Sequence, residues 1–379
     1  MGPRIYLDYQ ASTPTDSRVL ERMLPFFGNK AGNPHSDNAS GWEAQAAIDS
    51  ATQLIASELG CDAAEVIFTS GATESNNLAI LGVVRRAPKS RTRILVGAAE
   101  HKCILESARI AAERYGILVE LLPVDHEGAV RIETLSARLD ENVLLVSIMA
   151  ANNEVGTLQP VQELASACHA VGALFHTDGT HALTAGRIDV TAFGVDLLSL
   201  SSHKIYGPKG IGALYVEHDS LSKLEPLIYG GGQQRGLRSG TVPVPLCVGF
   251  GEAIRILGKE REQGESQQIS RLRDLLISGV LALNGQFRLN GPECDSRHPY
   301  NANIRLSGYD ARDVLSMLQP TVSASTGSAC TSGTMEPSHV LRAIGLTDTD
   351  ANASLRFGVG RFTSEEEIYR AIYHVAKVL

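Results

Sequence analysis

The sequence predicts an α/β protein, with a mostly parallel central sheet in a large domain and a smaller α+β domain beside it. From about residue 40 to 220, short apolar segments alternate with amphipathic stretches, which is typical of strands and helices in a layered α/β fold. After Pro243 this alternation stops and a long helical pattern begins. The 36 glycines suit the many tight turns that such a fold needs.

The strands of the large domain are expected to be short and buried, as in other parallel sheets. Amphipathic segments such as 103–115 and 161–171 are predicted to be the helices between them. The apolar segments that predict strands are 66–69, 94–97, 118–122, 144–149, 174–176, 196–199 and 213–216.

The C-terminal part predicts a different arrangement. A helical region spans about 246–284, with a charged middle at 259–268. A strand at 303–306, a helix at 311–318, a strand near Val322 and a final helix from Ser364 follow. We therefore expect a large domain of residues 16–255 and a small domain of residues 1–15 and 256–379.

Composition excludes several classes of protein. The net charge of −8 disfavours a nucleic-acid-binding surface, and no apolar stretch is long enough for a membrane helix. The N-terminus lacks the apolar core of a signal peptide. The six cysteines are scattered without a CxxC pair, so neither a disulfide framework nor a zinc site is expected. These features predict a cytoplasmic, reduced protein without a membrane partner.

Lys204 is the most informative residue. It lies in the segment SSHKIYGPKGIG (201–212), after the apolar run 195–200, so it is expected at the end of a buried strand. Loss of water around the ammonium lowers the pKa of a lysine, and a neutral amine attacks carbonyl groups. Lys204 is therefore a candidate Schiff-base lysine. A surface lysine that simply follows a strand is the alternative.

The segment VIFTSGATESN (66–76) predicts a strand, a turn of small residues and the start of a helix. Backbone N–H groups of such a turn, together with the helix dipole, bind anions well. The absence of a following GKS or GKT excludes a Walker loop. The alternative is an ordinary capped helix, with Thr73 and Asn76 as local hydrogen-bonding residues.

Three further polar turns follow predicted strands. Asp178 is expected at the carboxyl end of a buried strand, where open α/β sheets bind ligands. A carboxylate buried there needs a cationic partner such as a protonated pyridine, although a helix N-cap is the simpler interpretation. His101 could stack on a ring and move protons, or be an ordinary loop residue. The turn 152–156 is the third, and all these turns are expected to converge on one pocket.

The segment 323–333 consists almost entirely of small residues around Cys330. It predicts a mobile loop, of about residues 323–335, on which an accessible thiol could act as a nucleophile. A cysteine packed in a tight turn is the alternative. Cys61, Cys103, Cys168 and Cys247 lie in apolar or helical settings and are expected to be structural. Arg356, in a short strand, can bind a carboxylate or form a salt bridge.

At this point the chain resembles the cysteine desulfurases of the class V aminotransferase group, which have the pyridoxal phosphate (PLP) fold type I. The resemblance runs from YLDY at Tyr6 to Arg361, nearly the whole chain. The motifs SGATES, SxHKIYGPKG, RGxRSGT and GSACTS carry it, and they are specific when they occur together. The long cysteine loop resembles the iron–sulfur-cluster branch of the family.

The resemblance implies a PLP-dependent homodimer that converts L-cysteine to alanine. Lys204 would form the Schiff base with PLP, and Cys330 would attack the substrate sulfur and become a persulfide. Cys330 could also act as a transient cluster ligand, and no other metal site is implied. His101 would stack on the cofactor and transfer protons, while Asn153 and Arg356 would bind the substrate carboxylate. The cofactor-binding residues would be Ala72, Thr73, Asn153, Asp178, His181, Ser201, Ser202, His203 and, from the partner subunit, Thr241.

Some positions depart from the family pattern. His181 replaces a glutamine that contacts the ring oxygen of the cofactor, and an imidazole can donate the same bond. Ser202 replaces a usual glycine, and Ala150 a common histidine. The chain also lacks the longer tail with which members of the iron–sulfur branch bind their scaffold protein. The resemblance implies a scaffold protein as the sulfur acceptor, and the shorter tail makes a dedicated acceptor, as in tRNA thiolation or DNA phosphorothioation, the alternative.

Other functions remain as alternatives. A selenocysteine lyase or an aminotransferase would keep the fold and the cofactor, but an aminotransferase needs no loop thiol. A non-catalytic scaffold would tolerate loss of Lys204, Asp178 or Cys330, and all three are present. A nucleotide-binding protein that uses the turn 70–73 would need a metal-binding carboxylate motif, which is absent from the sequence.

Overall fold

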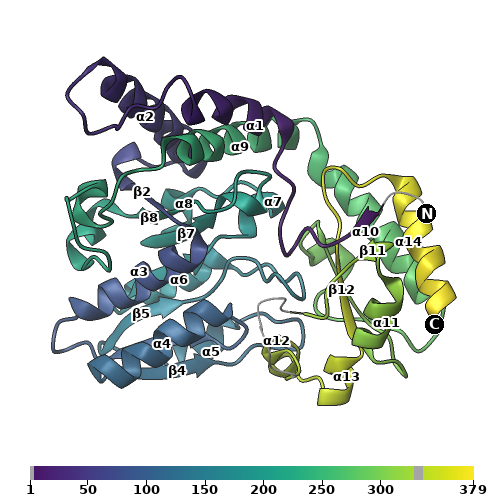
Figure 1. The fold of residues 1–379 in the computed structure, drawn as a ribbon. Helices are drawn as coiled ribbons and strands as arrows, with labels where there is room; N and C mark the ends of the chain where they lie inside the picture. Colours follow the sequence, from purple (N-terminus) through teal and green to yellow (C-terminus); the bar gives the residue numbers. More distant parts are fainter. Residues whose placement is uncertain (1–3, 328–335) are drawn as a thin grey trace.

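A computed structural model describes residues 4–327 and 336–379 (Figure 1). Its largest sheet has seven strands in the order β2-β8-β7-β6-β5-β3-β4. Four of its six strand pairings are parallel, and only β8 runs against the others. This confirms the predicted α/β fold. The strands are β2 Val66–Thr69, β3 Arg93–Gly97, β4 Leu118–Leu122, β5 Val143–Ser147, β6 Leu174–Asp178, β7 Leu197–Ser201 and β8 Gly212–Val216.

Helices cover both faces of this sheet. Successive side chains of a strand point to opposite faces, so Ile94 and Val96 join one apolar core and Leu95 joins the other. Helices α3 (Ala72–Arg85) and α4 (Lys102–Tyr115) contribute to the first core. The second core includes side chains of α2 (Ala39–Leu59), α6 (Val161–Ala170) and α9 (Val244–Glu262). Burial on both faces explains why most of these strands are largely apolar in the sequence, whereas the edge strand β4 is partly exposed.

A second unit is built on the three-stranded antiparallel sheet β12-β10-β9 and on the two-stranded parallel sheet β1-β11. Its apolar core joins Ile5 and Leu7 with side chains between 269 and 375. On this basis we propose the small domain of residues 1–15 and 256–379. Its elements are β1 Ile5–Tyr6, α10 Glu265–Leu281, β9 Arg288–Leu289, β10 Asn301–Arg305, α11 Ala311–Leu318, β11 Val322–Ser323, β12 Ser354–Gly358 and α14 Glu365–Val378.

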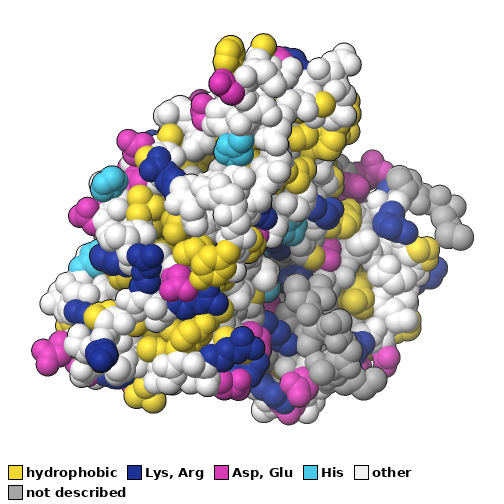
Figure 2. Space-filling model, turned by 60° about the vertical axis from the view of Figure 1, so that its left-hand side comes forward, with side chains coloured by type: hydrophobic (Ala, Val, Ile, Leu, Met, Phe, Trp, Pro, Cys, Tyr) yellow, Lys and Arg dark blue, Asp and Glu magenta, His cyan; other side chains and the backbone are white. Residues whose placement is uncertain are grey.

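Shorter helices complete the two units. They are α1 Ser17–Met23, α5 Ile132–Ser136, α7 Ala182–Ala185, α8 Val190–Phe193, α12 His339–Ala343 and α13 Asp348–Asn352. None of the helices among residues 4–327 and 336–379 is long and apolar enough to cross a membrane. On the face shown in Figure 2, basic side chains are interspersed with acidic and hydrophobic ones.

Two details of the prediction are wrong. The helical region 246–284 is not continuous, because Gly264 has a left-handed backbone (φ +86°) and separates α9 from α10. The predicted mobile loop begins too early, because Ser323 belongs to β11 and pairs with Tyr6 of β1. The backbone of Ser325 also exchanges two hydrogen bonds with Arg356, so these residues are held by strand pairing.

The side chain of Arg361 joins three separate parts of the chain. Its guanidinium forms ion pairs with Asp16, which precedes α1, and with Glu265 at the start of α10. It also stacks on the ring of Tyr206, at 4.1 Å from the ring centroid. All four residues are largely buried, so each charge depends on its partners.

Replacement of Arg361 by alanine should therefore lower the free energy of unfolding by about 3 kcal/mol, because two carboxylates lose their buried partner. Urea denaturation of the PLP-loaded protein measures this change. Arg109→Ala is the matched control, because Arg109 pairs with Glu106 and Glu113 on an exposed helix face and should have little effect. Equal effects of the two substitutions would contradict this account.

His298 connects the two units at a second point. Its Nε2 donates to the carbonyl oxygen of His181 (2.9 Å) and lies 3.0 Å from the hydroxyl of Thr184, while Nδ1 accepts from the N–H of Tyr300. Burial, together with the charges of Arg273 and Arg297, lowers the pKa of His298 to about 4. The folded protein therefore holds this ring neutral.

Between pH 6.5 and 4 the unfolded chain binds a proton at His298 that the folded chain does not bind, so stability should fall as the pH falls through this window. His298→Gln should remove this contribution, which is up to about 1.4 kcal/mol per pH unit. Urea unfolding at several pH values gives the slope, and His218→Gln, on the surface, is the control. An unchanged slope in His298→Gln would disprove the assignment.

Candidate active site

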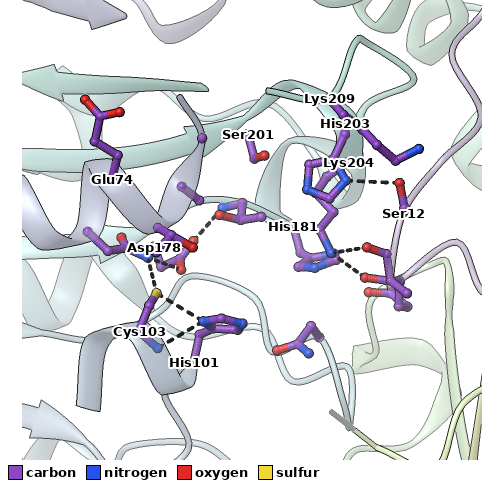
Figure 3. A pocket seen from close by; sticks show the side chains of 18 of the residues that line it. Ser12, Glu74, His101, Cys103, Asp178, His181, Ser201, His203, Lys204 and Lys209 are labelled. Atoms are coloured by element: carbon purple, nitrogen blue, oxygen red, sulfur yellow. Dashed lines mark hydrogen bonds between the residues drawn. The ribbon is translucent and has the colours of Figure 1, made fainter. Parts of the chain in front are cut away.

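A pocket of about 520 Å³ lies at the carboxyl edge of the large sheet, where the second unit meets it (Figure 3). The carboxyl ends of β2, β3, β5, β6 and β7 meet at this edge because these strands run in the same direction. The pocket brings together ten of the predicted site residues, from six segments of the chain. They are Ala72, Thr73, His101, Asn153, Asp178, His181, Ser201, His203, Lys204 and Arg356.

Lys204 lies one turn beyond the end of β7, in a short 3-10 helix of residues Ser202–Lys204. Its Nζ donates to the carbonyl oxygens of Gln10 (2.6 Å) and Ala11 (2.9 Å), as Figure 3 shows. These carbonyls belong to the N-terminal segment, which crosses from β1 to the large unit. The amine is thus held at the pocket by main-chain atoms.

The start of α3 forms the predicted anion site. Gly71 precedes the helix with φ +148°, a conformation that glycine adopts readily. Among the described residues no side chain caps α3, so the N–H groups of its first turn remain available to an anion. Ser201 and His203 line the same part of the pocket. Burial and the nearby charges of Lys204 and Lys209 lower the pKa of His203 to about 4.

Asp178 ends β6 and is almost fully buried. One carboxylate oxygen accepts a hydrogen bond from Asn76 Nδ2 (2.8 Å), and the other accepts from the N–H of Thr180 (2.9 Å). Both donors are neutral, so the negative charge of Asp178 has no ion-pair partner among the described residues. A cationic ring nitrogen in the pocket would provide one.

His101 is the N-cap of α4 and also lines the pocket. Its Nδ1 accepts a hydrogen bond from the N–H of Cys103 (3.2 Å) and lies 3.0 Å from Cys103 Sγ. Cys103 itself lines the pocket, so its prediction as a purely structural cysteine missed this position. The signal was present in the sequence, because residue 103 comes only two positions after the polar turn at His101.

Arg356 is 1% exposed and lies in the central part of β12. Its Nη1 donates to the carbonyl oxygen of Asn153 and its Nη2 to Asp8 Oδ1, each at 3.2 Å. Its Nε has no hydrogen-bond partner among the described residues. Arg356 therefore keeps donor capacity for a carboxylate, and the role of Asp8 was not predicted from the sequence.

His181 is buried and lines the pocket beside these groups. Burial, with the nearby charge of Lys204, lowers its pKa well below the usual range. Its ring therefore enters the pocket uncharged at neutral pH. A neutral imidazole can donate one hydrogen bond to a ligand oxygen.

Three predicted residues are not part of the pocket as described. Ser202 is fully buried, and a side chain on Gly207 would meet its hydroxyl at 2.0 Å, so this hydroxyl lies against the following turn. Thr241 is exposed and does not line the pocket of its own chain. Cys330 lies outside the described residues.

The groups in the pocket fit PLP. The open helix N-terminus suits a phosphate, Lys204 supplies a primary amine, and Asp178 is a buried carboxylate without a cationic partner among the described residues. The cofactor would be held by these residues, with His101 beside its ring. PLP withdraws electrons from an amino acid bound to it and so makes the α-proton acidic.

Comparison with known proteins agrees with this fit. Residues 5–370 match the aminotransferase class-V family. A cysteine desulfurase IscS of Rickettsia akari is 45% identical over 97% of this chain and 89% of its own. A solved NifS-like protein superposes with a TM-score of 0.92 at 32% identity over 99% of both chains. SspA in complex with cysteine gives 0.82 at 33%, over 95% of this chain and 99% of its own.

The PLP-compatible pocket and the full-length similarity lead to one conclusion. The chain belongs to the class-V aminotransferase family and, within it, to the PLP-dependent cysteine desulfurases.

Proposed function

We propose that this enzyme transfers the sulfur of L-cysteine to Cys330 and releases L-alanine. The observation that carries this proposal is the convergence of Lys204, Asp178, His101 and Arg356 on one pocket. A lysine, an acid and a carboxylate-binding arginine suit an amino acid processed on PLP. The solved complex of the related SspA with cysteine supports this choice of substrate.

The substrate carboxylate is assigned to Arg356 and Asn153. The guanidinium is oriented by Asp8 on one side and by the carbonyl oxygen of Asn153 on the other. A planar guanidinium held in this way binds a carboxylate with defined geometry. The α-carbon of the substrate would then lie between Arg356 and Lys204.

The remaining cofactor contacts are assigned by the chemistry of each side chain. Ala72, Thr73, Ser201 and His203 would bind the phosphate, and Asp178 the ring nitrogen. His181 would donate to the ring oxygen. The buried position of the Ser202 hydroxyl does not support a direct cofactor contact for that residue.

The reaction then needs a proton transfer and a nucleophile. His101 would move the proton, and the thiolate of Cys330 would attack the sulfur of the substrate. The new S–S bond forms as the C–S bond of the substrate breaks. The electron pair of the C–S bond remains on the substrate carbon, which is then protonated to give alanine. Cysteine and one enzyme thiol thus become alanine and one enzyme persulfide.

The described residues on either side of 328–335 support this role for Cys330. On one side, the backbone of Ser325 pairs with Arg356. On the other, His339 Nε2 lies 2.8 Å from the carbonyl oxygen of Glu100, next to His101. Ser325 and His339, which flank these residues in the sequence, therefore lie next to two residues that line the pocket, Arg356 and His101.

The persulfide would be delivered to an acceptor protein. The similarity to cysteine desulfurases named IscS favours a scaffold protein of iron–sulfur cluster assembly. Enzymes of tRNA thiolation or DNA phosphorothioation are the other acceptors that we propose. Pull-down with persulfide-loaded enzyme, followed by transfer of radioactive sulfur, would distinguish them.

We also propose that the enzyme is a homodimer in which Thr241 of each subunit completes the phosphate site of the other. Thr241 is exposed in the single chain and does not line its own pocket. Phe27, Trp42 and Tyr229 are each more than 60% exposed, and a second copy of the chain would cover such large apolar side chains.

Replacement of Cys330 by serine should preserve the visible absorbance of bound PLP but abolish persulfide formation, because only the nucleophile is lost. Incubation with L-[³⁵S]cysteine and non-reducing gel electrophoresis measures the label on the protein. Lys204→Ala should instead lose the absorbance. Retention of label in Cys330→Ser would show that another thiol accepts the sulfur.

Mixing two inactive variants tests Thr241. In a mixed heterodimer, one subunit carries Lys204→Ala and the other carries Thr241→Ala. If Thr241 contacts the site of the partner subunit, one of the two sites has both original residues, so alanine production should reappear. If Thr241 acts within its own chain, every site keeps one defect and activity stays low. A monomeric mass in light scattering would overturn the homodimer directly.

A further inference from the structure

Cys103 contacts the side chain that our proposed function uses for proton transfer. Its backbone N–H donates to His101 Nδ1 at 3.2 Å, and its Sγ lies 3.0 Å from the same nitrogen (Figure 3). A backbone N–H can only donate, so this contact favours a lone pair on Nδ1. In the neutral ring the proton is then on Nε2, on the far side of the ring from Cys103.

The thiol is oriented from its other side by Asn76. Asn76 Nδ2 donates to Cys103 Sγ at 3.3 Å and to Asp178 Oδ2 at 2.8 Å. Asn76 is fully buried, and its Oδ1 has no partner among the described residues. An amide turned the other way would place Oδ1 against the carboxylate of Asp178, so the repulsion fixes its orientation.

These contacts give the hydrogen bonds a single direction. Asp178 only accepts, so Asn76 donates to it and, with its second N–H, to Cys103. Because Sγ accepts from Asn76, its own S–H is left to donate to His101 Nδ1, the nearest acceptor, at 3.0 Å. The charge of Asp178 is thereby connected to the tautomer of His101 through two neutral side chains.

We propose that Cys103 is a positioning residue that holds His101 in the Nε2–H tautomer, so that the ring meets cofactor and substrate as a proton donor. The inference rests on the proposed role of His101 in proton transfer, and it adds that the ring donates the proton from Nε2. Protonation at Nδ1 would set that N–H against the backbone N–H of Cys103. The neutral ring therefore gives a proton from Nε2 more readily than it takes one at Nδ1.

The first test observes the tautomer directly. Nitrogen NMR of the PLP-loaded enzyme with ¹⁵N-labelled histidine distinguishes a protonated ring nitrogen from an unprotonated one, and His101→Gln assigns the signal. In Cys103→Ala the Nδ1 signal should move toward that of a protonated nitrogen, because one of two donors is lost. Cys103→Ser, whose hydroxyl both donates and accepts, should restore the original position.

The second test follows the reaction. Cys103→Ala should lower kcat for alanine formation about fivefold, the effect of one neutral hydrogen bond, and Cys103→Ser should recover most of it. The KM for L-cysteine should not change, because Arg356 and Asn153 belong to other elements. Cys61→Ala, at another partly buried cysteine, is the matched control and should change neither readout.

The outcomes separate this inference from the proposed function. An unmoved Nδ1 signal in Cys103→Ala overturns the positioning role, whether or not kcat falls. If the Nδ1 signal moves in Cys103→Ala but kcat does not change, the positioning by Cys103 is not important for catalysis. If the unmodified enzyme forms no alanine from L-cysteine, the proposed function fails, and the NMR measurement still decides the tautomer.

Discussion

The N-terminal segment of residues 8–13 holds the basic side chains of the site in place, and the arrangement of the pocket depends on it. Asp8 forms the ion pair with Arg356, the carbonyls of Gln10 and Ala11 accept from Lys204, and Ser12 Oγ lies 3.1 Å from His203 Nδ1. The segment starts in the small unit and ends on the large one. The position of the arginine relative to the lysine is therefore set by a stretch of six residues.

Burial divides the polar groups of the pocket into charged and neutral ones. Loss of hydration, together with Lys204, lowers the pKa values of both His181 and His203, so at neutral pH these rings form hydrogen bonds without adding charge. Lys204 and Arg356 are basic groups of the pocket, and Asp178 is a buried acidic one. A zwitterionic amino acid and an anionic cofactor match such a distribution better than a neutral ligand would.

Much of this architecture could be predicted from local patterns. Most strands of the large sheet were found because they are buried on both faces and therefore largely apolar, although the edge strand β4 is partly exposed. The polar turns share one edge because the strands that they follow are parallel. Contacts between distant segments could not be predicted. Asp8 and Asn76 are ordinary residues in the sequence, and only the packing of α3 and the N-terminal segment brings them to the pocket. Periodicity alone likewise predicts one helical region at 246–284, whereas Gly264 divides it into α9 and α10.

Helix α3 shows how one element can set two parts of a site. Its first turn offers free N–H groups to an anion, and Asn76, four residues after Ala72, reaches Asp178 and Cys103. Four residues of α-helix rise about 6 Å, so the backbone of α3 sets the distance between the anion site and Asn76, which binds the carboxylate of Asp178 on β6. A ligand that binds both the N-terminus of α3 and Asp178 must have its phosphate and its cationic ring nitrogen separated by the distance between these two groups. The selectivity for such a ligand thus comes from a rigid helix, which side-chain rotation cannot alter.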